Sequence, residues 1–559
     1  MTGSPIDTLA DRYLELILSA DPLMATLMGF REHDADLGDL SANHEESLAE
    51  ARADLRRAAL LVDPAGLAPQ EQVTRSILLA QLDYDDAMAS VDLPDFTVAA
   101  FPVSPSSVLL SYVRMVVATT PEQADAYLAR LSRIPRYLAQ AQERLERGRR
   151  AGLTPVAHLV QMAVDQIDRY LATEPNPLLI AAPTDWDDVE RWHADLRAEL
   201  AEDVNPAFVA YRDALVESAL PTARSSDTPG LIHLPGGRAR YEALVRVHTT
   251  TDRTPEELHD LGVRLVGDVH AEFRTLGRTL FDLDDVAAIF AHLQDDPALR
   301  WQSSEQILAA AETAVRRAES VSHEWFGRVP AAVCELEAIP ELEAEGAAPA
   351  YYMPPALDGS RPGTYFTNVN RPTERTSFDL EAVAYHEAVP GHHFQISLAL
   401  ELDGLPRLRQ LPLFTAYVEG WGLYSERLAD EMGLYSSPLQ RMGMLSAEVW
   451  RAARLVVDTG LHALGWTRQQ AIDYMIENTP VAPLDVESEV DRYIAYPGQA
   501  LSYMTGRLEI ERLRALAQEA LGDRFDIRDF HDTVLSSGAL PLSVLADVID
   551  DWITESIGG

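Results

Sequence analysis

Three histidines and a glutamate lie close together in one segment of the sequence, and these residue types bind and use catalytic metal ions. His386 and Glu387 are adjacent, and His392 and His393 follow after a short interval. A neutral imidazole is a good zinc ligand, and a carboxylate beside it can take a proton from a water at the metal. Packing alone does not explain so dense a cluster, so the segment predicts a catalytic metal ion and a hydrolytic reaction.

The spacing of these histidines differs from the usual zinc-peptidase pattern, in which two histidines stand at positions i and i+4 of one helix. Pro390 occupies the position of that second histidine, and on a regular helix the rings of His386 and His392 would point about 120° apart. Proline interrupts the hydrogen-bond ladder and Gly391 tolerates unusual dihedral angles. We therefore expect a break or bulge that returns His392 to the face of His386. His393 is the second candidate ligand and the first candidate for a substrate contact.

The third ligand is expected from another part of the chain, because a catalytic zinc ion takes three protein ligands and keeps one position open. Glu419 lies in a mainly apolar segment, where an ionised carboxylate is costly unless a cation pairs with it. The glycines on either side of Trp421 indicate close approach of another backbone. Glu426 lies on the same helical face and is the alternative ligand, and a salt bridge to Arg427 or Arg451 is the alternative role for either glutamate. Three side chains form the predicted ligand set for one zinc ion: His386, His392 and Glu419.

A later segment supplies donors for the oxyanion that forms when water attacks a carbonyl group. Pro497-Gly498 ends one predicted helix and the next begins directly after it, and groups at a helix N-terminus readily face ligands. Arg492 is a candidate for binding a peptide carboxylate in a bidentate pair. The candidates for contact with the oxyanion or the substrate are Tyr496, Gln499 and Tyr503. Packing is the commoner use of each of these residues taken singly.

Asp458 and His462 stand at positions i and i+4 of a predicted helix. Such a pair can hydrogen-bond to the metal ligands and orient them, or it can contact the substrate. A surface pair without function is the alternative. We include His462 among the candidate substrate contacts.

The overall composition excludes several classes of function. The chain has 559 residues, of which 47% are hydrophobic, and this is enough for a large core. It has 88 acidic and 46 basic residues, so the formal net charge is −42, which disfavours binding to nucleic acid or to an anionic membrane surface. The single cysteine, Cys334, allows no disulfide within the chain, and residues 1–7 lack the pattern of a secretory signal. We expect a cytoplasmic location.

Most of the sequence has the periodicity of amphipathic helices, as in Pro255–Leu276, which Thr254 precedes as the predicted cap. Val329–Asn370 differs, because its short apolar runs are separated by proline and glycine and predict a few strands. Thr222–Gly237 is rich in Ser, Pro and Gly and is the predicted connection between two parts of the chain. The predicted parts are an N-terminal helical lobe at 1–230 and a C-terminal helical lobe with the metal site at 231–559, which share one core.

These motifs resemble those of a bacterial family called domain of unknown function 885 (DUF885). Its features are a His-Glu-Ala-x-Pro-Gly-His-His signature, a Glu-Gly-Trp segment and a Pro-Gly-Gln-Ala segment. They match His386–His393, Glu419–Trp421 and Pro497–Ala500, and the likeness extends over most of the chain, including Tyr351–Gly363.

The family in turn is similar to the helical zinc oligopeptidases angiotensin-converting enzyme, thimet oligopeptidase and neurolysin. This resemblance implies a mainly α, two-lobed metallopeptidase-like fold with a deep central channel and a small β-sheet near the active site. The longer interval after His386 leaves open whether His392 or His393 is the second ligand. The resemblance also implies an edge strand that pairs with a bound peptide, and Gly363–Asn368, with Tyr365 as a substrate contact, is the counterpart here. An ordinary structural hairpin is the alternative.

The motifs and the resemblance together indicate a zinc-dependent hydrolase of short peptides, similar to carboxypeptidases or oligopeptidases, with Glu387 as the general base. A metal-dependent amidohydrolase that acts on a non-peptide or isopeptide amide is the first alternative. A non-catalytic binding protein that a metal ion stabilises is the second, and its ion would have four protein ligands. A small peptide is the expected partner, and nucleic acids and membranes are not.

Overall fold

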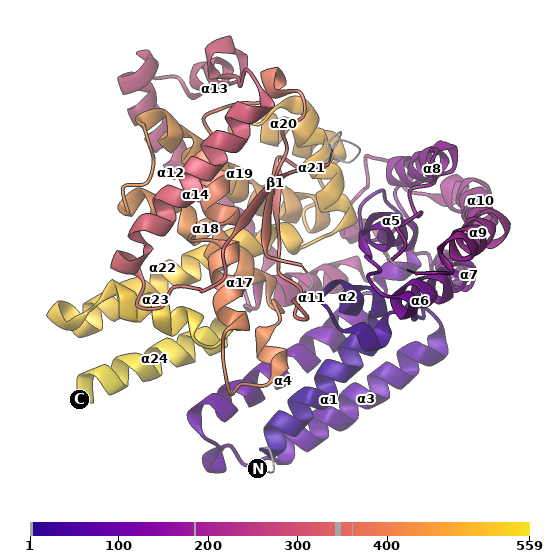
Figure 1. Ribbon diagram of the computed structural model, residues 1–559. Coiled ribbons are helices and arrows are strands. Elements are labelled where there is room, and N and C mark those ends of the chain that lie inside the picture. Colours follow the sequence, from indigo (N-terminus) through magenta and orange to yellow (C-terminus); the bar gives the residue numbers. More distant parts are fainter. Residues whose placement is uncertain (1–3, 184–185, 341–347, 360, 559) are drawn as a thin grey trace.

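The chain is mainly helical and carries one small β-sheet, as its periodicity predicts (Figure 1). The computed structural model describes residues 4–183, 186–340, 348–359 and 361–558. Within these ranges, none of the helices combines the length and the apolar character that crossing a membrane requires.

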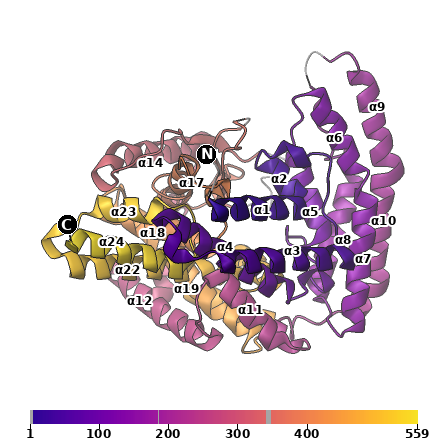
Figure 2. The same cartoon turned by 90° about the horizontal axis from the view of Figure 1, so that it is seen from below.

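The N-terminal helices form two groups. The first group contains α1, α3 and α4, which contact one another, and the second runs from α5 to α10 and lies on one side of the molecule (Figure 2). The bounds are α1 (Pro5–Ala20), α2 (Pro22–Leu27), α3 (Ala42–Leu61), α4 (Pro69–Ala89), α5 (Pro105–Tyr112), α6 (Pro121–Leu131), α7 (Ile134–Arg150), α8 (Ala157–Ala172), α9 (Val189–Glu199) and α10 (Asn205–Ala214).

The remaining helices form the C-terminal part of the chain. Their bounds are α11 (Gly237–Thr249), α12 (Pro255–Phe281), α13 (Val286–Asp295), α14 (Ser304–Trp325), α16 (Leu380–Glu387), α17 (His392–Leu400), α18 (Thr415–Glu431), α19 (Pro438–His462), α20 (Arg468–Asn478), α21 (Pro483–Ala495), α22 (Ser502–Leu521), α23 (Ile527–Leu535) and α24 (Leu542–Gly558). Two of them, α16 and α17, carry the histidines.

Helix α12 illustrates how local sequence sets these elements. The Thr254 hydroxyl accepts a hydrogen bond from the Glu257 amide at 3.2 Å, and the Glu257 carboxylate accepts one from the Thr254 amide at 2.8 Å, so the predicted cap is confirmed. Leu258, Val266 and Phe273 are buried on one face of the helix. This apolar face packs against α19, which extends toward the histidine segment.

Three short strands form the sheet. The strands are β1 (Glu335–Ala338), β2 (Ala350–Met353) and β3 (Thr364–Thr367), in the order β1-β3-β2. β2 and β3 fall in the predicted apolar runs Ala350–Met353 and Thr364–Val369, whereas β1 overlaps the predicted run Ala332–Leu336 only at the last two residues of that run. β3 pairs in parallel with β1 and antiparallel with β2. The expectation that Gly363–Asn368 is an edge strand is therefore wrong, because β3 is hydrogen-bonded on both sides and has no free edge for a peptide.

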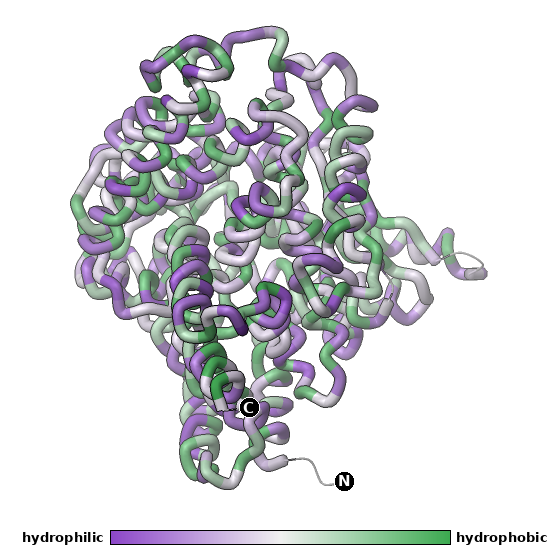
Figure 3. The backbone as a smooth tube through the Cα atoms, turned by 90° about the vertical axis from the view of Figure 1, so that its left-hand side faces the viewer, coloured by the Kyte–Doolittle hydropathy of each residue, from purple (hydrophilic) through white to green (hydrophobic). Residues whose placement is uncertain are grey.

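Close helix packing fixes α18 against α22. A Cβ atom added at Gly420 would lie 2.5 Å from the Cα atom of Gly506, and one added at Gly506 would overlap the carbonyl oxygen of Ala416. Only glycine permits this approach, as the glycines around Trp421 predict. Hydrophobic and hydrophilic residues alternate along the helices, and their apolar faces form the buried core (Figure 3).

One core cluster includes both N-terminal residues such as Phe96 and Leu159 and C-terminal residues such as Leu455 and Met504. A second cluster, which contains Trp192 and Phe208, comes from the N-terminal helices. The division of the chain at residue 230 stays a prediction.

Candidate metal centre

The histidine segment is broken into two helices. α16 ends at Glu387 and α17 begins at His392, so the break predicted from Pro390 and Gly391 is confirmed. A Cβ atom at Gly391 would overlap the carbonyl oxygen of His386, so glycine is required for the chain to turn this closely. The turn brings the rings of His386 and His392 to within 4.7 Å of each other, centroid to centroid.

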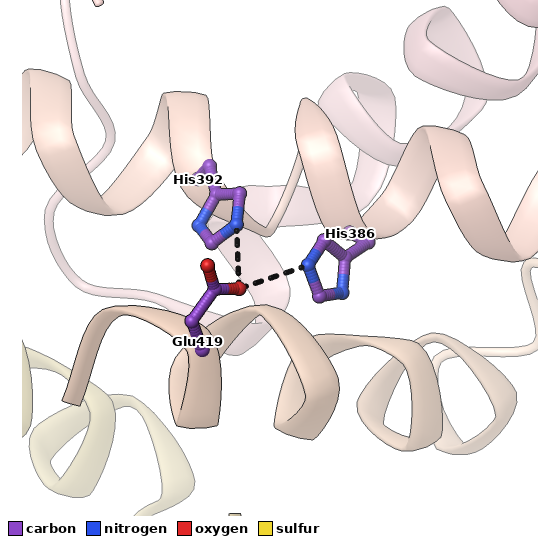
Figure 4. A group of neighbouring side chains, drawn as sticks. All are labelled: His386, His392 and Glu419. Atoms are coloured by element: carbon purple, nitrogen blue, oxygen red, sulfur yellow. Dashed lines mark ion pairs between the residues drawn. The ribbon is translucent and has the colours of Figure 1, made fainter. Parts of the chain in front are cut away.

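His386, His392 and Glu419 converge from α16, α17 and α18 (Figure 4). Glu419 Oε2 lies 3.6 Å from His386 Nε2 and 3.4 Å from His392 Nε2. One potential ligand atom from each residue lies within 4.8 Å of the other two. Both histidines are buried, with exposures of 3% and 8%.

The geometry and chemistry of these three residues, here called the triad, fit a zinc ion. Ligand atoms held at 2.0 to 2.1 Å by one tetrahedral zinc ion lie about 3.4 Å apart, which is close to the distances from Glu419 to the two histidines. Two imidazole nitrogens and one carboxylate oxygen are the donor set of a catalytic zinc site that keeps a position open. The triad therefore meets the requirement in the number and type of donors and in the spacing of Glu419 from each histidine.

Gly422 makes room for the triad on α18. A Cβ atom at this position would lie 2.8 Å from His386 Cε1 and 3.0 Å from His392 Cε1. Such contacts are too short for carbon atoms, so the two imidazole rings can lie against α18 only over a glycine.

Glu426 supports His386 from the side opposite the triad. His386 Nδ1 and Glu426 Oε1 lie 2.8 Å apart, and the Glu426 side chain is buried. A carboxylate at Nδ1 fixes the ring and directs Nε2 toward a metal ion. Glu426 was the alternative ligand, and its spacing of two helical turns from Glu419 is the sequence signal for this supporting position. Arg451 lies 3.8 Å from Glu426, whereas Arg427 pairs with Glu272.

The triad is electrostatically coupled. Burial lowers the pKa of His386, but the carboxylates of Glu419 and Glu426 outweigh burial and raise this pKa to about 9. Burial alone would raise the pKa of Glu419, whereas His386 and His392 hold it well below its usual range. The negative charge of Glu419 thus requires a positive charge between the rings, which a proton or a metal cation can supply.

Glu387, the predicted general base, is half-buried at the end of α16 beside His386. Its charge acts on Tyr365, whose pKa is raised by burial first and by Glu387 second. Tyr365 is fully buried in the central strand of the sheet. Tyr365 therefore has no exposed surface with which to make the predicted substrate contact in this conformation.

His393 is oriented toward the sheet. Its Nδ1 lies 3.0 Å from the Tyr352 hydroxyl, and its Nε2 lies 3.1 Å from the carbonyl oxygen of Ala332. Because a carbonyl only accepts, Nε2 carries the proton and Nδ1 accepts from Tyr352. Both nitrogens are thus engaged away from the triad, and the structure favours His392 as the second ligand.

Tyr503 lies beside the triad. Its ring stacks on that of His386 with a centroid separation of 6.4 Å, and its pKa is raised by burial and next by the charge of Glu419. Gln499 donates to the Tyr503 hydroxyl at 3.4 Å and accepts from Arg492 at 2.8 Å. The structure therefore links three of the predicted donors in one chain of contacts that leads to the triad.

Tyr496 and His462 make packing contacts and backbone hydrogen bonds in this structure. Tyr496 packs edge-on against the ring of His248 at 5.2 Å. His462 accepts from the Leu231 amide at 3.2 Å and lies 3.0 Å from the Tyr493 carbonyl, so both of its nitrogens bind backbone groups. The structure does not pair Asp458 with His462.

Asp458 instead holds the turn before Gln499. The Gly498 amide lies 3.1 Å from both oxygens of Asp458, and Tyr241 donates to the same carboxylate. Gly498 has a φ of 87°, a conformation that glycine adopts without strain. The Pro-Gly-Gln-Ala segment is thus anchored where it turns toward Tyr503.

Comparison with known proteins places the chain in a family. The structure of "the putative lipoprotein from Colwellia psychrerythraea" is similar with 28% sequence identity and a TM-score of 0.91, over 99% of this chain and 100% of that chain. A "putative lipoprotein of unknown function from Shewanella oneidensis" has 17% identity and a TM-score of 0.74, over 98% and 100% of the two chains, and shares the fold. No curated protein matches the chain. The model of the family described as "Bacterial protein of unknown function (DUF885)" matches residues 22–549, and the chain belongs to this family.

Proposed function

We propose that the protein is a zinc-dependent hydrolase that cleaves peptide bonds of short peptides. The convergence of His386, His392 and Glu419 at distances suited to one zinc ion is the observation that carries this proposal. The carboxylate of Glu426 behind His386 supports it further, because catalytic zinc sites use such a carboxylate to orient the ligand histidine.

Each residue of the site has a role in this mechanism. When bound by the triad, a zinc ion would polarise a carbonyl group and make water more acidic. Glu387 takes a proton from the attacking water and passes it to the departing amine. Tyr503, beside the triad, donates a hydrogen bond to the oxyanion.

The proposal includes a two-lobed, metallopeptidase-like fold with a channel that admits peptides and excludes folded proteins. In this proposal the group α5–α10, which lies on one side of the molecule in Figure 2, forms part of the N-terminal lobe. Substrate selection in such a fold would follow from the width of the channel, and the acidic surface would not hinder short peptides of low charge.

The test combines metal analysis with product analysis. The purified protein is expected to bind one zinc ion, and metal-loaded protein incubated with a mixed peptide library is expected to release products that mass spectrometry identifies. A chelated sample is the control, and isopeptides form a separate arm of the library. Stoichiometric zinc with cleavage of isopeptides alone would point to an amidohydrolase, and no cleavage of any amide would refute hydrolysis.

A further inference from the structure

A group of charged residues adjoins the triad and contains more positive than negative charge; Arg454 in this group is buried, whereas Arg492 and Glu489 are partly exposed. Arg454 from α19 and Arg492 from α21 share one carboxylate, that of Glu489, whose Oε2 lies 3.0 Å from Arg454 and 2.9 Å from Arg492. The Tyr493 hydroxyl donates to the same oxygen at 2.7 Å. These three charged residues are here called the arginine cluster.

The negative charge of Glu489 does not balance the cluster. Burial alone would raise the pKa of Glu489, but the charges of Arg492 and Arg454 hold it well below its usual range, so the carboxylate is ionised. The two guanidinium groups carry two positive charges and the carboxylate carries one negative charge, so one positive charge in the arginine cluster is not balanced. Asp458 is a nearby buried carboxylate that accepts hydrogen bonds from Gly498 and Tyr241, and burial raises its pKa to about 7, so it offsets the remaining positive charge only in part.

One nitrogen of Arg454, Nη1, is not used in the hydrogen bonds of the arginine cluster. Arg454 is only 4% exposed, its Nε donates to the Tyr493 hydroxyl, and its Nη2 donates to Glu489. Its Nη1 is buried and has no hydrogen-bond partner in the described part of the chain. The ring faces of Trp450 and Tyr503, at 4.6 and 4.5 Å, offset part of the charge but supply no oxygen acceptor. A buried guanidinium with an unpaired donor is costly unless a ligand completes it.

Tyr503 connects the cluster to the triad. Its ring lies against the guanidinium of Arg454 and also stacks on the ring of His386 at 6.4 Å. An anion bound by Arg454 would therefore lie within roughly three peptide units of the triad.

We propose that Arg454, together with Arg492, binds the free α-carboxylate of the substrate, so that the protein removes residues from the carboxyl ends of peptides. A guanidinium matches a carboxylate in a bidentate pair, and the spare charge and the unpaired Nη1 are what such an anion would satisfy. In a chain with a net charge of −42, an anionic end needs a local positive charge to bind at all. This inference rests on the proposed peptidase function, and it assigns the carboxylate chiefly to Arg454, which the sequence analysis did not single out.

The test measures binding, so that it does not depend on turnover. Zinc-loaded Glu387→Gln protein is titrated with N-acetyl-trialanine and with its C-terminal amide. The acid is expected to bind about 10- to 100-fold more tightly than the amide, which corresponds to one charge-assisted pair. In Glu387→Gln/Arg454→Gln protein, the affinity for the acid is expected to fall to that for the amide, which stays unchanged.

Arg441→Gln in the Glu387→Gln background is the matched control, because Arg441 lies on the same helix but pairs with Asp430 on α18. It is expected to keep the preference for the acid. If Glu387→Gln protein binds the acid and the amide equally, or binds neither, the proposal is overturned. This outcome does not depend on any variant of Arg454. An Arg454→Gln exchange that weakens both ligands equally also overturns it, because a purely structural role would act in that way.

The outcomes separate this inference from the proposed function. If the native protein cleaves free acids and amides of the same peptides at equal rates, the peptidase stands and the carboxylate site falls. If it cleaves no peptide but prefers the acid in the titration, the peptidase function falls and the carboxylate site stands.

Discussion

Glu426 Oε1 lies 2.8 Å from Nδ1 of His386, on the side of the ring that faces away from Glu419. The same imidazole is thus held between two carboxylates, one within the triad and one behind it. This arrangement fixes the orientation of His386 through contacts at both of its ring nitrogens.

The first prediction concerns this supporting contact. Glu426→Gln keeps an acceptor for His386 but removes the charge that makes the imidazole a better ligand, so zinc affinity is expected to fall about 10- to 100-fold. Competition with a chromogenic chelator measures the affinity. Glu431→Gln is the control, since Glu431 lies on the same helix and pairs with Arg514. An unchanged affinity in Glu426→Gln would mean that the contact is only structural.

The second prediction uses the glycine under the triad. Gly422→Ala places a Cβ atom 2.8 Å from His386, so the rings must move and zinc binding is expected to be lost or weakened by more than tenfold. Gly267→Ala is the control, because it lies in helix α12 and its new Cβ would have no neighbour within 4 Å. This control is expected to bind zinc normally and to be more stable by up to about 1 kcal/mol. Normal zinc binding by Gly422→Ala would contradict the packing argument.

The third prediction concerns the general base. Glu387→Gln removes the proton acceptor but none of the triad, so the protein is expected to bind zinc normally while kcat on a peptide substrate falls about 10²- to 10⁴-fold. Steady-state kinetics and metal analysis of the same sample measure both quantities. Glu374→Gln, an exposed position shortly before α16, is the matched control and is expected to keep full activity. Full activity of Glu387→Gln would reject the mechanism.

Much of the centre could be predicted from the sequence because its determinants are local. Pro390 and Gly391 lie between the two ligand histidines, so the break in the helix follows from residue types alone. Glu419 is conspicuous as a charge among apolar residues. The positions of β2 and β3 also follow from short apolar runs between breakers, whereas β1 contains two glutamates and extends beyond the predicted run.

The rest depends on contacts between distant segments. The order of the strands places β3 in the middle of the sheet, and no local pattern encodes that order. His393 has the same side chain as its neighbour His392, and its contacts with Tyr352 and Ala332, which lie far away in the sequence, orient it toward the sheet. In the sequence, Arg454 looks like an ordinary helix residue. Its role depends on α21, which places Glu489 and a second arginine beside it in the fold.

The last prediction is that acid destabilises the fold through buried neutral histidines. Burial lowers the pKa of His462 and of His531 to about 3, and that of His248 to about 4. The unfolded chain binds protons at these residues near pH 6.5, so the stabilisation is fully present above that pH and is lost as pH falls toward 3 to 4.

For one such histidine, the free energy of unfolding is expected to drop by up to about 2 kcal/mol between pH 6.5 and pH 5. His462→Gln retains an acceptor and a donor for Leu231 and Tyr493 but cannot be protonated. Chemical denaturation at both pH values should therefore show a smaller loss for this variant than for the native protein, even if the variant is less stable at pH 7. An equal loss in both proteins would show that His462 does not contribute to the acid sensitivity.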